Sequence, residues 1–213
     1  MRKPRSIQPY GASALLLQWE QRIDADIVQS VHRYAAGLAS LPGVDECIPA
    51  YASLLLTYRA KRTTYDRLFE AACAFQPIAG AVPPARHHEL PVVYGGEYGP
   101  DLDYVSEQTG LRPQDVVALH CSVDYLVYFL GFRPGFAFLG PLPPALSVPR
   151  LPTPRPRVVA GSVGITGAQT GVYPSPSPGG WPLIGRCLSS LFTTDGTGAR
   201  LQAGDRVRFT VAP

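Results

Sequence analysis

Hydrophobic and polar positions over the first ninety residues follow a pattern typical of a small α+β unit. Residues 13–20 form an apolar run of strand length, and residues 53–59 alternate, with Leu54, Leu56 and Tyr58 on one face. Apolar residues at helical spacing follow each strand, one set after Asp24, which is placed as an N-cap, and one over 63–75. The order ββαββα predicts two helices on one face of a small antiparallel sheet.

The pattern after residue 88 predicts a domain rich in strands. Apolar strand-like runs lie at 90–94 and 125–132, and two short helices are expected between them. Gly110 should end the first of these helices, and Pro113 suits the first turn of the second.

The next segment, residues 131–189, holds 10 glycines and 12 prolines, which excludes long helices. The C-terminal run predicts a last strand with Val207, Phe209 and Val211 facing inward, so that an antiparallel barrel or sandwich closes.

A segment rich in proline and alanine, residues 76–88, indicates a linker between domains 1–88 and 89–213. His87 and His88 are adjacent, so on an extended chain they point in opposite directions, and no metal site is expected there. The four cysteines show no C-x-x-C spacing, and neither a signal peptide nor a membrane-spanning stretch is recognised. We therefore expect a cytoplasmic protein, not membrane-bound, with reduced and mostly buried thiols.

Charge adds little to this picture. The net charge is +3 and no run of five like charges occurs, which argues against nucleic acid as a partner.

The glycines of residues 161–171, GSVGITGAQTG, raise the question of a phosphate-binding loop. A Walker A loop needs a lysine, but the only lysines, Lys3 and Lys61, lie in the first half. The spacing G-x-x-G-x-x-G is not the dinucleotide fingerprint, and Pro174 prevents a helix directly after it. Two interpretations remain: the glycines serve tight turns and crossings in a barrel, or they form the wall of a pocket.

Side chains able to bind an anion or an amide lie around these glycines. Upstream and downstream arginines offer a planar fork suited to carboxylate or phosphate. His120 is the one histidine after residue 88, and hence either an acid/base candidate or a packed helix residue. The other polar candidates are Arg133, Arg150, Arg155, Arg157, Ser162, Thr166, Gln169, Thr170, Tyr173, Ser175, Ser177 and Arg186.

Long motifs of the second half carry a family resemblance. Residues 119–140 (LHCSVDYLVYFLGFRPGFAFLG) and 160–186 (AGSVGITGAQTGVYPSPSPGGWPLIGR) resemble the B subunit of the prokaryotic ATP-dependent 5-oxoprolinase, and residues 42–56 and 90–102 fit as well. That family is also known as allophanate hydrolase subunit 1 and as a sporulation-kinase inhibitor, and is related to the carboxyltransferase domain of urea amidolyase.

The resemblance implies a fold and a reaction. It implies an α+β protein with a small N-terminal α/β-sandwich (ferredoxin-like) domain and a C-terminal cyclophilin-like β-barrel. The expected reaction is cleavage of 5-oxoproline to glutamate at the expense of ATP, with Mg²⁺ accompanying the nucleotide and no bound metal or prosthetic group. The expected partners are the C subunit, in direct contact, and the A subunit, in a hetero-oligomer.

The resemblance also suggests site residues. It implies catalytic roles for His120, Arg133 and Arg186. The residues that it implies for binding of substrate or nucleotide are Arg150, Ser162, Gln169, Thr170 and Tyr173. The sequence departs from the family pattern at Phe138, where a tyrosine is common, and at Leu151, where a second arginine often follows Arg150.

Two other functions stay open at this stage. The chain could be a non-catalytic inhibitor of a sensor histidine kinase, using the apolar, proline-rich residues 136–146 as a binding face. It could also be an allophanate hydrolase or carboxyltransferase-type subunit whose remaining parts are separate proteins.

Overall fold

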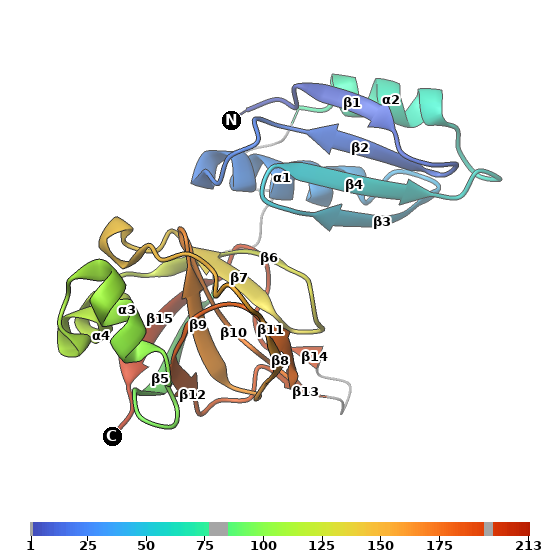
Figure 1. The fold of residues 1–213 in the computed structure, drawn as a ribbon. Coiled ribbons are helices and arrows are strands. Elements are labelled where there is room, and N and C mark those ends of the chain that lie inside the picture. The colour runs from blue at the N-terminus through green and yellow to red at the C-terminus, as the bar shows by residue number, and fades with distance from the viewer. Residues whose placement is uncertain (1, 77–84, 194–197) are drawn as a thin grey trace. The chain divides into compact units, whose positions relative to one another are not determined.

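The computed structural model describes residues 2–76, 85–193 and 198–213 (Figure 1). The chain forms two compact units, Met1–Pro84 and Ala85–Pro213. The predicted linker is wrong for His87 and His88, because β5 (His87–Tyr94) begins with them and pairs them with the C-terminal strand. The central part of that linker, 77–84, lies outside the described residues.

The first unit has the predicted order ββαββα. Its four strands pair antiparallel in the order β1-β2-β4-β3, and α1 and α2 pack on one face of the sheet (Figure 1). The ferredoxin-like description stays a prediction. The elements are β1 (Ser6–Pro9), β2 (Ala14–Gln18), α1 (Ala25–Leu38), β3 (Val44–Pro49), β4 (Ser53–Tyr58) and α2 (Tyr65–Ala74).

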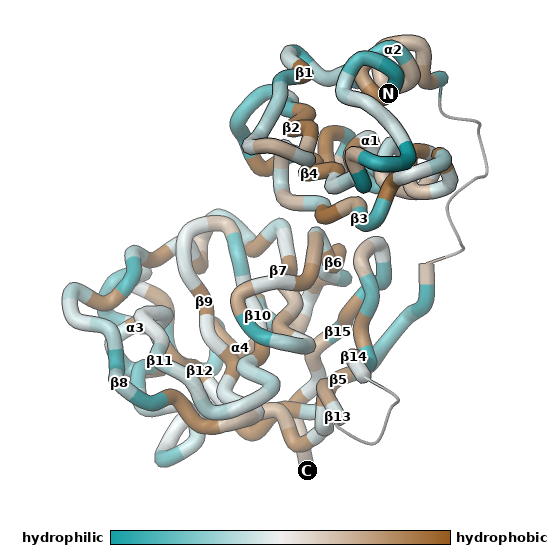
Figure 2. The backbone as a smooth tube through the Cα atoms, turned by 90° about the vertical axis from the view of Figure 1, so that its right-hand side faces the viewer, coloured by the Kyte–Doolittle hydropathy of each residue, from teal (hydrophilic) through white to brown (hydrophobic). Residues whose placement is uncertain are grey.

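Alternation along β2 and β4 builds the core of this unit. Leu15 and Leu17 of β2 and Leu54 and Leu56 of β4 have no exposed surface, and Figure 2 shows the hydrophobic positions along both strands. The Asp24 carboxylate accepts hydrogen bonds from two backbone N–H groups of the first turn, at 3.0 and 3.2 Å, which confirms the predicted N-cap.

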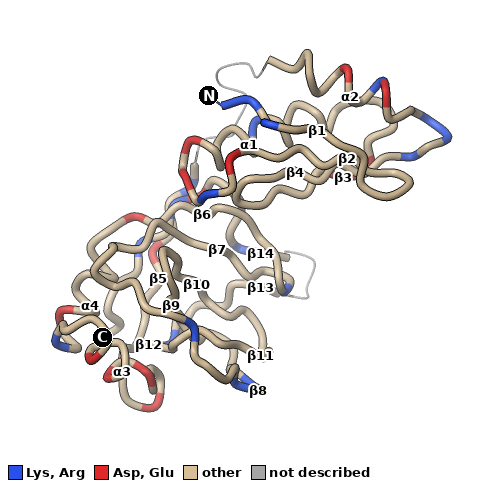
Figure 3. Tube along the Cα trace, turned by 45° about the horizontal axis from the view of Figure 1, so that its top comes forward, with Lys and Arg blue, Asp and Glu red and all other residues tan. Residues whose placement is uncertain are grey.

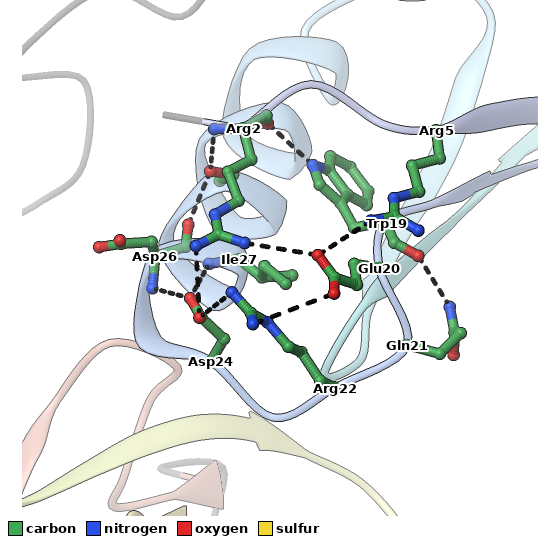
Figure 4. A network of polar contacts seen from close by, with 10 residues as sticks. Arg2, Arg5, Trp19, Glu20, Gln21, Arg22, Asp24, Asp26 and Ile27 are labelled. Carbon is green, nitrogen blue, oxygen red and sulfur yellow. Dashed lines mark hydrogen bonds and ion pairs between the residues drawn. The ribbon is translucent and has the colours of Figure 1, made fainter.

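Ion pairs tie the N-terminal segment to the loop between β2 and α1 and hold that loop together (Figure 4). Arg5 and Arg2 reach Glu20 at 3.0 and 3.6 Å, and Arg22 reaches Asp24 at 2.8 Å. The indole N–H of Trp19 donates to the Arg2 carbonyl at 2.8 Å. These charges are partly exposed, so each pair contributes little stability by itself, and they mainly fix where the first strand enters the sheet.

The second unit is built on a closed seven-stranded barrel, in the order β10-β7-β6-β15-β5-β12-β9. The predicted barrel is confirmed, but one of its pairings, β15 with β5, is parallel rather than antiparallel. The barrel strands are β5, β6 (Tyr125–Leu130), β7 (Ala137–Gly140), β9 (Ser162–Thr166), β10 (Gln169–Val172), β12 (Leu183–Cys187) and β15 (Arg206–Val211). The cyclophilin-like description stays a prediction.

Val211 corrects one sequence prediction. Val207 and Phe209 of β15 are fully buried as expected, but Val211 is 62% exposed. Val211 is on the same face of the strand as Val207 and Phe209, but it is the last residue of β15. A side chain on that face is buried only where other barrel residues cover it.

Helices and short ribbons complete the unit. Gly110 takes the left-handed conformation after α3, and Pro113 opens α4, as predicted. No helix among the described residues is long and apolar enough to cross a membrane. The remaining elements are α3 (Leu102–Thr109), α4 (Pro113–Cys121), η1 (Pro144–Leu146), the ribbon of β8 (Arg155–Val158) with β11 (Ser177–Gly179), and the ribbon of β13 (Phe192–Thr193) with β14 (Gly198–Ala199).

The cysteines are free thiols, as expected. The prediction that most of them are buried is wrong. Cys187 is buried, Cys47 and Cys121 are half-buried, and Cys73 is exposed on α2.

Candidate functional site

The glycines of residues 161–171 form the β9–β10 hairpin. Gly167 has a φ of +51° in the turn, and Gly164 and Gly171 face each other across the two strands. A methyl group on Gly164 would lie 3.0 Å from Trp181 Cβ, and one on Gly171 would lie 3.1 Å from Phe136 Cζ. The glycines therefore allow a tight turn and let two aromatic side chains lie directly on the hairpin.

Those two side chains belong to a pocket of about 250 Å³, which we call the aromatic pocket. Phe136 is central to it: its ring centroid is 4.9 Å from Phe138, 5.2 Å from Tyr173 and 5.7 Å from Trp181. These are edge-to-face contacts, which fix the angles between the rings. The lining residues are Phe132, Phe136, Phe138, Arg150, Pro154, Tyr173, Pro178, Gly179, Gly180 and Trp181.

Polar groups gather at the Tyr173 hydroxyl. The hydroxyl lies against Gly179, where an added methyl group would come within 2.4 Å of the oxygen. Burial raises the pKa of Tyr173, while a backbone hydrogen bond from Trp181 and the charges of Arg150 and Arg155 act in the opposite direction. The guanidinium groups of Arg150 and Arg155 are thus close enough to the Tyr173 hydroxyl to act on its pKa.

Arg155 is held by a buried carboxylate. Its Nη2 donates to Asp101 Oδ1 at 2.7 Å, and Asp101 Oδ2 accepts from the Leu183 backbone N–H at 2.6 Å. Figure 3 shows basic positions on β8 and acidic positions on α3. Arg155 Nη1 is buried and has no hydrogen-bond partner among the described residues. The guanidinium therefore keeps an unused donor next to Pro154, which lines the aromatic pocket.

His120 lies in a closed network of hydrogen bonds. It is fully buried, with Nδ1 2.7 Å from the Tyr94 hydroxyl and Nε2 2.9 Å from Thr170 Oγ1. The Thr170 hydroxyl donates to the Gly164 carbonyl at 3.1 Å, so its oxygen accepts from Nε2–H, and Nδ1 accepts from Tyr94.

The ring of His120 stacks on Phe209 at 4.5 Å, and burial lowers the His120 pKa to about 3. Both ring nitrogens are occupied and the imidazole is neutral. The described contacts give no support to the expected acid/base role of His120 at an accessible pocket.

The other predicted site residues fall into separate groups. Arg150 and Tyr173 line the aromatic pocket, and Arg133 lies beside it, in a hollow formed by residues 130–135. Ser162 and Arg186 are neighbours across β9 and β12. Gln169 opens β10 opposite Thr166, and Thr170 belongs to the buried His120 network.

Arg186 has an environment of its own. Its guanidinium carbon lies 4.9 Å from the centre of the Tyr98 ring, a cation–π geometry. Its Nε is buried without a hydrogen-bond partner among the described residues. Arg186 does not line the aromatic pocket. The structure therefore brings together Arg150, Tyr173 and Arg133, and leaves the remaining candidates outside this group.

Sequence reasoning missed the aromatic lining and Asp101. Phe132, Phe136, Phe138 and Trp181 gave a usable signal, because these aromatic residues recur in a segment rich in glycine and proline. Asp101 directly precedes α3, where a helix cap is expected, but its side chain makes no capping bond and binds β12 instead.

A second polar cluster lies at the start of the barrel. Asp205 accepts from Arg86 Nη2 at 2.7 Å and lies 3.0 Å from His88 Nε2. Burial acts to raise the pKa of Asp205, but its hydrogen bonds, first of all from Arg86, outweigh burial and hold the pKa below its usual value. Within the described residues, no group of three or more His, Cys, Asp or Glu side chains is placed to hold a metal.

Comparison with known proteins decides the family. Residues 5–201 match the family model of the carboxyltransferase domain, subdomains C and D. This chain belongs to that family. It is 39% identical to the B subunit of 5-oxoprolinase from Bacillus subtilis (strain 168), over 95% of this chain and 91% of that protein. It is 42% identical to the B subunit of 5-oxoprolinase from Escherichia coli O157:H7, over 93% of this chain and 92% of that protein.

A solved structure extends the comparison. The crystal structure of TTHA0988 matches this carboxyltransferase domain protein with a TM-score of 0.83 and 38% identity over 95% of this chain. The match covers 40% of the TTHA0988 chain. The module seen here is therefore part of a longer chain in that relative.

Proposed function

We propose that this chain is the B subunit of an ATP-dependent 5-oxoprolinase, which cleaves 5-oxo-L-proline to L-glutamate together with the A and C subunits. The observation that carries the proposal is the identity of 39% and 42% to two proteins named as the B subunit of 5-oxoprolinase, over more than nine-tenths of both chains in each comparison. The finer fold names, ferredoxin-like for the first unit and cyclophilin-like for the barrel, belong to this proposal.

The substrate chemistry is compatible with the aromatic pocket. 5-Oxoproline has a compact five-membered lactam ring and one carboxylate. Aromatic side chains offer a surface for the ring, and Arg150 on the same lining offers a planar donor pair for the carboxylate.

The resonance-stabilised lactam amide resists attack by water, and ATP hydrolysis supplies the driving force. The overall reaction consumes ATP and two water molecules, one at the amide bond and one in the hydrolysis of ATP, and yields glutamate, ADP and phosphate. The glycine segment of this chain is a barrel hairpin rather than a phosphate loop. We therefore assign the binding of ATP and Mg²⁺ to the assembled complex.

The partners follow from the same proposal. A protein named as a B subunit works with other subunits, and the match to 40% of TTHA0988 supports a further module joined to this one in that relative. We place the C subunit in direct contact with this chain and the A subunit in the same hetero-oligomer. Because the reaction consumes ATP, the proposal places the complex in the cytoplasm.

Reconstitution tests the proposal. Purified chain is mixed with the matching A and C subunits, and glutamate and ADP are followed from 5-oxoproline and ATP while each protein is omitted in turn. We expect turnover that disappears without this chain and that falls in Arg150→Ala. Arg112→Ala, which removes an exposed arginine on the helical side of the same unit, should leave turnover unchanged.

The opposite result is also informative. A complex of folded subunits that produces no glutamate would overturn the proposal. Inhibition of a sensor histidine kinase, or activity as an allophanate hydrolase or carboxyltransferase-type subunit, would then be the functions to assay.

A further inference from the structure

Phe132 combines two unfavourable features on the surface of the barrel unit. Its side chain is 61% exposed, and its backbone has a φ of +67°. Among the described residues it is the one non-glycine residue with a positive φ, a conformation in which Cβ crowds the backbone. Glycine would adopt this conformation without strain, and glycines do stand close by at 131 and 135.

Packing within the fold does not explain this side chain. Its described ring contact is one edge-to-face contact with Phe136, at 5.5 Å between centroids. The packing of a buried aromatic side chain can offset the free energy of backbone strain, but a ring that is mostly exposed makes too few contacts to do so. Strain kept at an exposed position is a feature of binding sites, where a ligand supplies the missing contact.

Phe132 is placed where a ligand would meet it. It lines the aromatic pocket, and it also lines the neighbouring hollow of residues 130–135. The ring therefore stands at the boundary between the two, next to the buried ring of Phe136. A ligand seated against Phe136 and Trp181 would have Phe132 as its outer neighbour.

The charges around the pocket indicate the class of ligand. The lining contains one charged side chain, Arg150, and no ion pair of Arg150 occurs among the described residues. Arg155 lies near the same wall: its Nη2 is paired with Asp101, and its Nη1 has no hydrogen-bond partner among the described residues. Apolar walls and unpaired guanidinium donors favour a small ring compound that carries a carboxylate.

We propose that the aromatic pocket binds a small ring carboxylate, that Phe132 covers the ring of the bound ligand, and that Arg150 receives its carboxylate. Identification of this ligand as 5-oxoproline rests on the proposed function. The positive φ of Phe132 holds the ring at the mouth of the pocket, at the expense of backbone strain that a glycine would remove.

The first test uses the reconstituted complex and four variants. Phe132→Gly removes the ring and relieves the strain, and Phe132→Asn removes the ring with a residue that tolerates a positive φ. Phe132→Tyr keeps the ring. Val211→Ala is the matched control, because Val211 is 62% exposed and lies outside the aromatic pocket.

We expect Phe132→Gly and Phe132→Asn to raise the KM for 5-oxoproline by about tenfold, the effect of losing one well-placed aromatic contact, with the KM for ATP unchanged. Both variants should keep the melting temperature of the wild type, since the relieved strain offsets the lost contact. Phe132→Tyr, which keeps the aromatic ring, should raise the KM for 5-oxoproline much less than the two ring-less variants do, and Val211→Ala should match the wild type. An unchanged KM for 5-oxoproline in both ring-less variants would overturn the proposal, and so would a drop in melting temperature in both of them.

The second test needs no partner and separates this inference from the proposed function. Fluorotryptophan labelling gives one ¹⁹F resonance for Trp181 in the pocket and one for Trp19 in the other unit, an internal control. The full chain is titrated with 5-oxoproline, proline and benzoate.

A shift confined to Trp181 that is weakened in Phe132→Gly supports the pocket, even if the wild-type complex has no 5-oxoprolinase activity. If none of these three compounds moves the Trp181 resonance, or if Phe132→Gly binds as the wild type does, the pocket assignment is wrong, whatever the complex catalyses.

Discussion

The buried histidine of the barrel predicts an acid sensitivity that can be measured. His120 has a pKa of about 3 in the folded protein, against 6.5 for an ordinary imidazole, because burial disfavours its charged form. Between these two values the unfolded chain binds a proton that the folded chain does not. Stability therefore falls as the pH drops through this window.

The size of the effect follows from the two pKa values. A pH of 5 lies about 1.5 units below the pKa of the imidazole in the unfolded chain, which is therefore protonated, while the folded imidazole remains neutral. At about 1.4 kcal/mol for each unit, His120 removes about 2 kcal/mol of barrel stability between pH 8 and pH 5. Both ring nitrogens bind hydroxyl groups, those of Tyr94 and Thr170. Among the described residues no carboxylate contacts the ring, so no acid offsets this loss of stability.

The assay compares the wild type with His120→Gln, which cannot titrate. Urea unfolding is followed at pH 8 and pH 5 through the ¹⁹F resonance of Trp181, which reports on the barrel unit alone. The variant will be less stable at both values, but its loss on going to pH 5 should be about 2 kcal/mol smaller than that of the wild type. Titrations of other groups cancel in this difference.

Two results would refute the reasoning. Wild type and variant could lose the same stability between the two pH values. Alternatively, the imidazole nitrogen resonances of His120 could titrate between pH 8 and pH 5 in the folded protein, which would show that the ring is accessible to protons.

Three further predictions follow from contacts described above. Asp101→Ala should destabilise the barrel by about 3 kcal/mol in urea unfolding, because Arg155 and a backbone N–H both lose the buried carboxylate that accepts their hydrogen bonds. Asp101→Asn should destabilise it less, because the amide oxygen is still an acceptor. Asp24→Ala should lower the stability of the first unit by about 1 kcal/mol, read from the Trp19 resonance, while Asp24→Asn, also a good N-cap, stays close to the wild type. A thiol reagent followed by mass spectrometry should modify exposed Cys73 before Cys187, whose pKa is raised by burial, and the reverse order would contradict the structure.

The sequence predicts local features of this fold well and long-range ones less well. The cap at Asp24, the helix end at Gly110 and the helix start at Pro113 depend on neighbouring residues alone, and the structure confirms all three. The parallel pairing of β15 with β5 joins distant segments, and periodicity carries no information about strand direction.

The candidate site shows the same division. Arg150 and Tyr173 were predictable because their chemistry is visible in the sequence, and they do line one pocket. His120 has equally visible chemistry, but burial, which the sequence does not display, makes it a neutral core residue. Phe132 shows the converse case: its significance comes from a backbone angle, which no residue type discloses.

The strand pairing that closes the barrel has a consequence for synthesis of the chain. β15 pairs with β5 from Arg206 opposite His87 to Val211 opposite Val92. The barrel therefore cannot close until its final residues have left the ribosome, whereas the first unit has all of its strands and helices within residues 1–84. During translation a folded first unit would therefore precede an open β-sheet, whose edge at β5 has no partner until Arg206–Val211 is available. In this interval the exposed edge can pair with another chain.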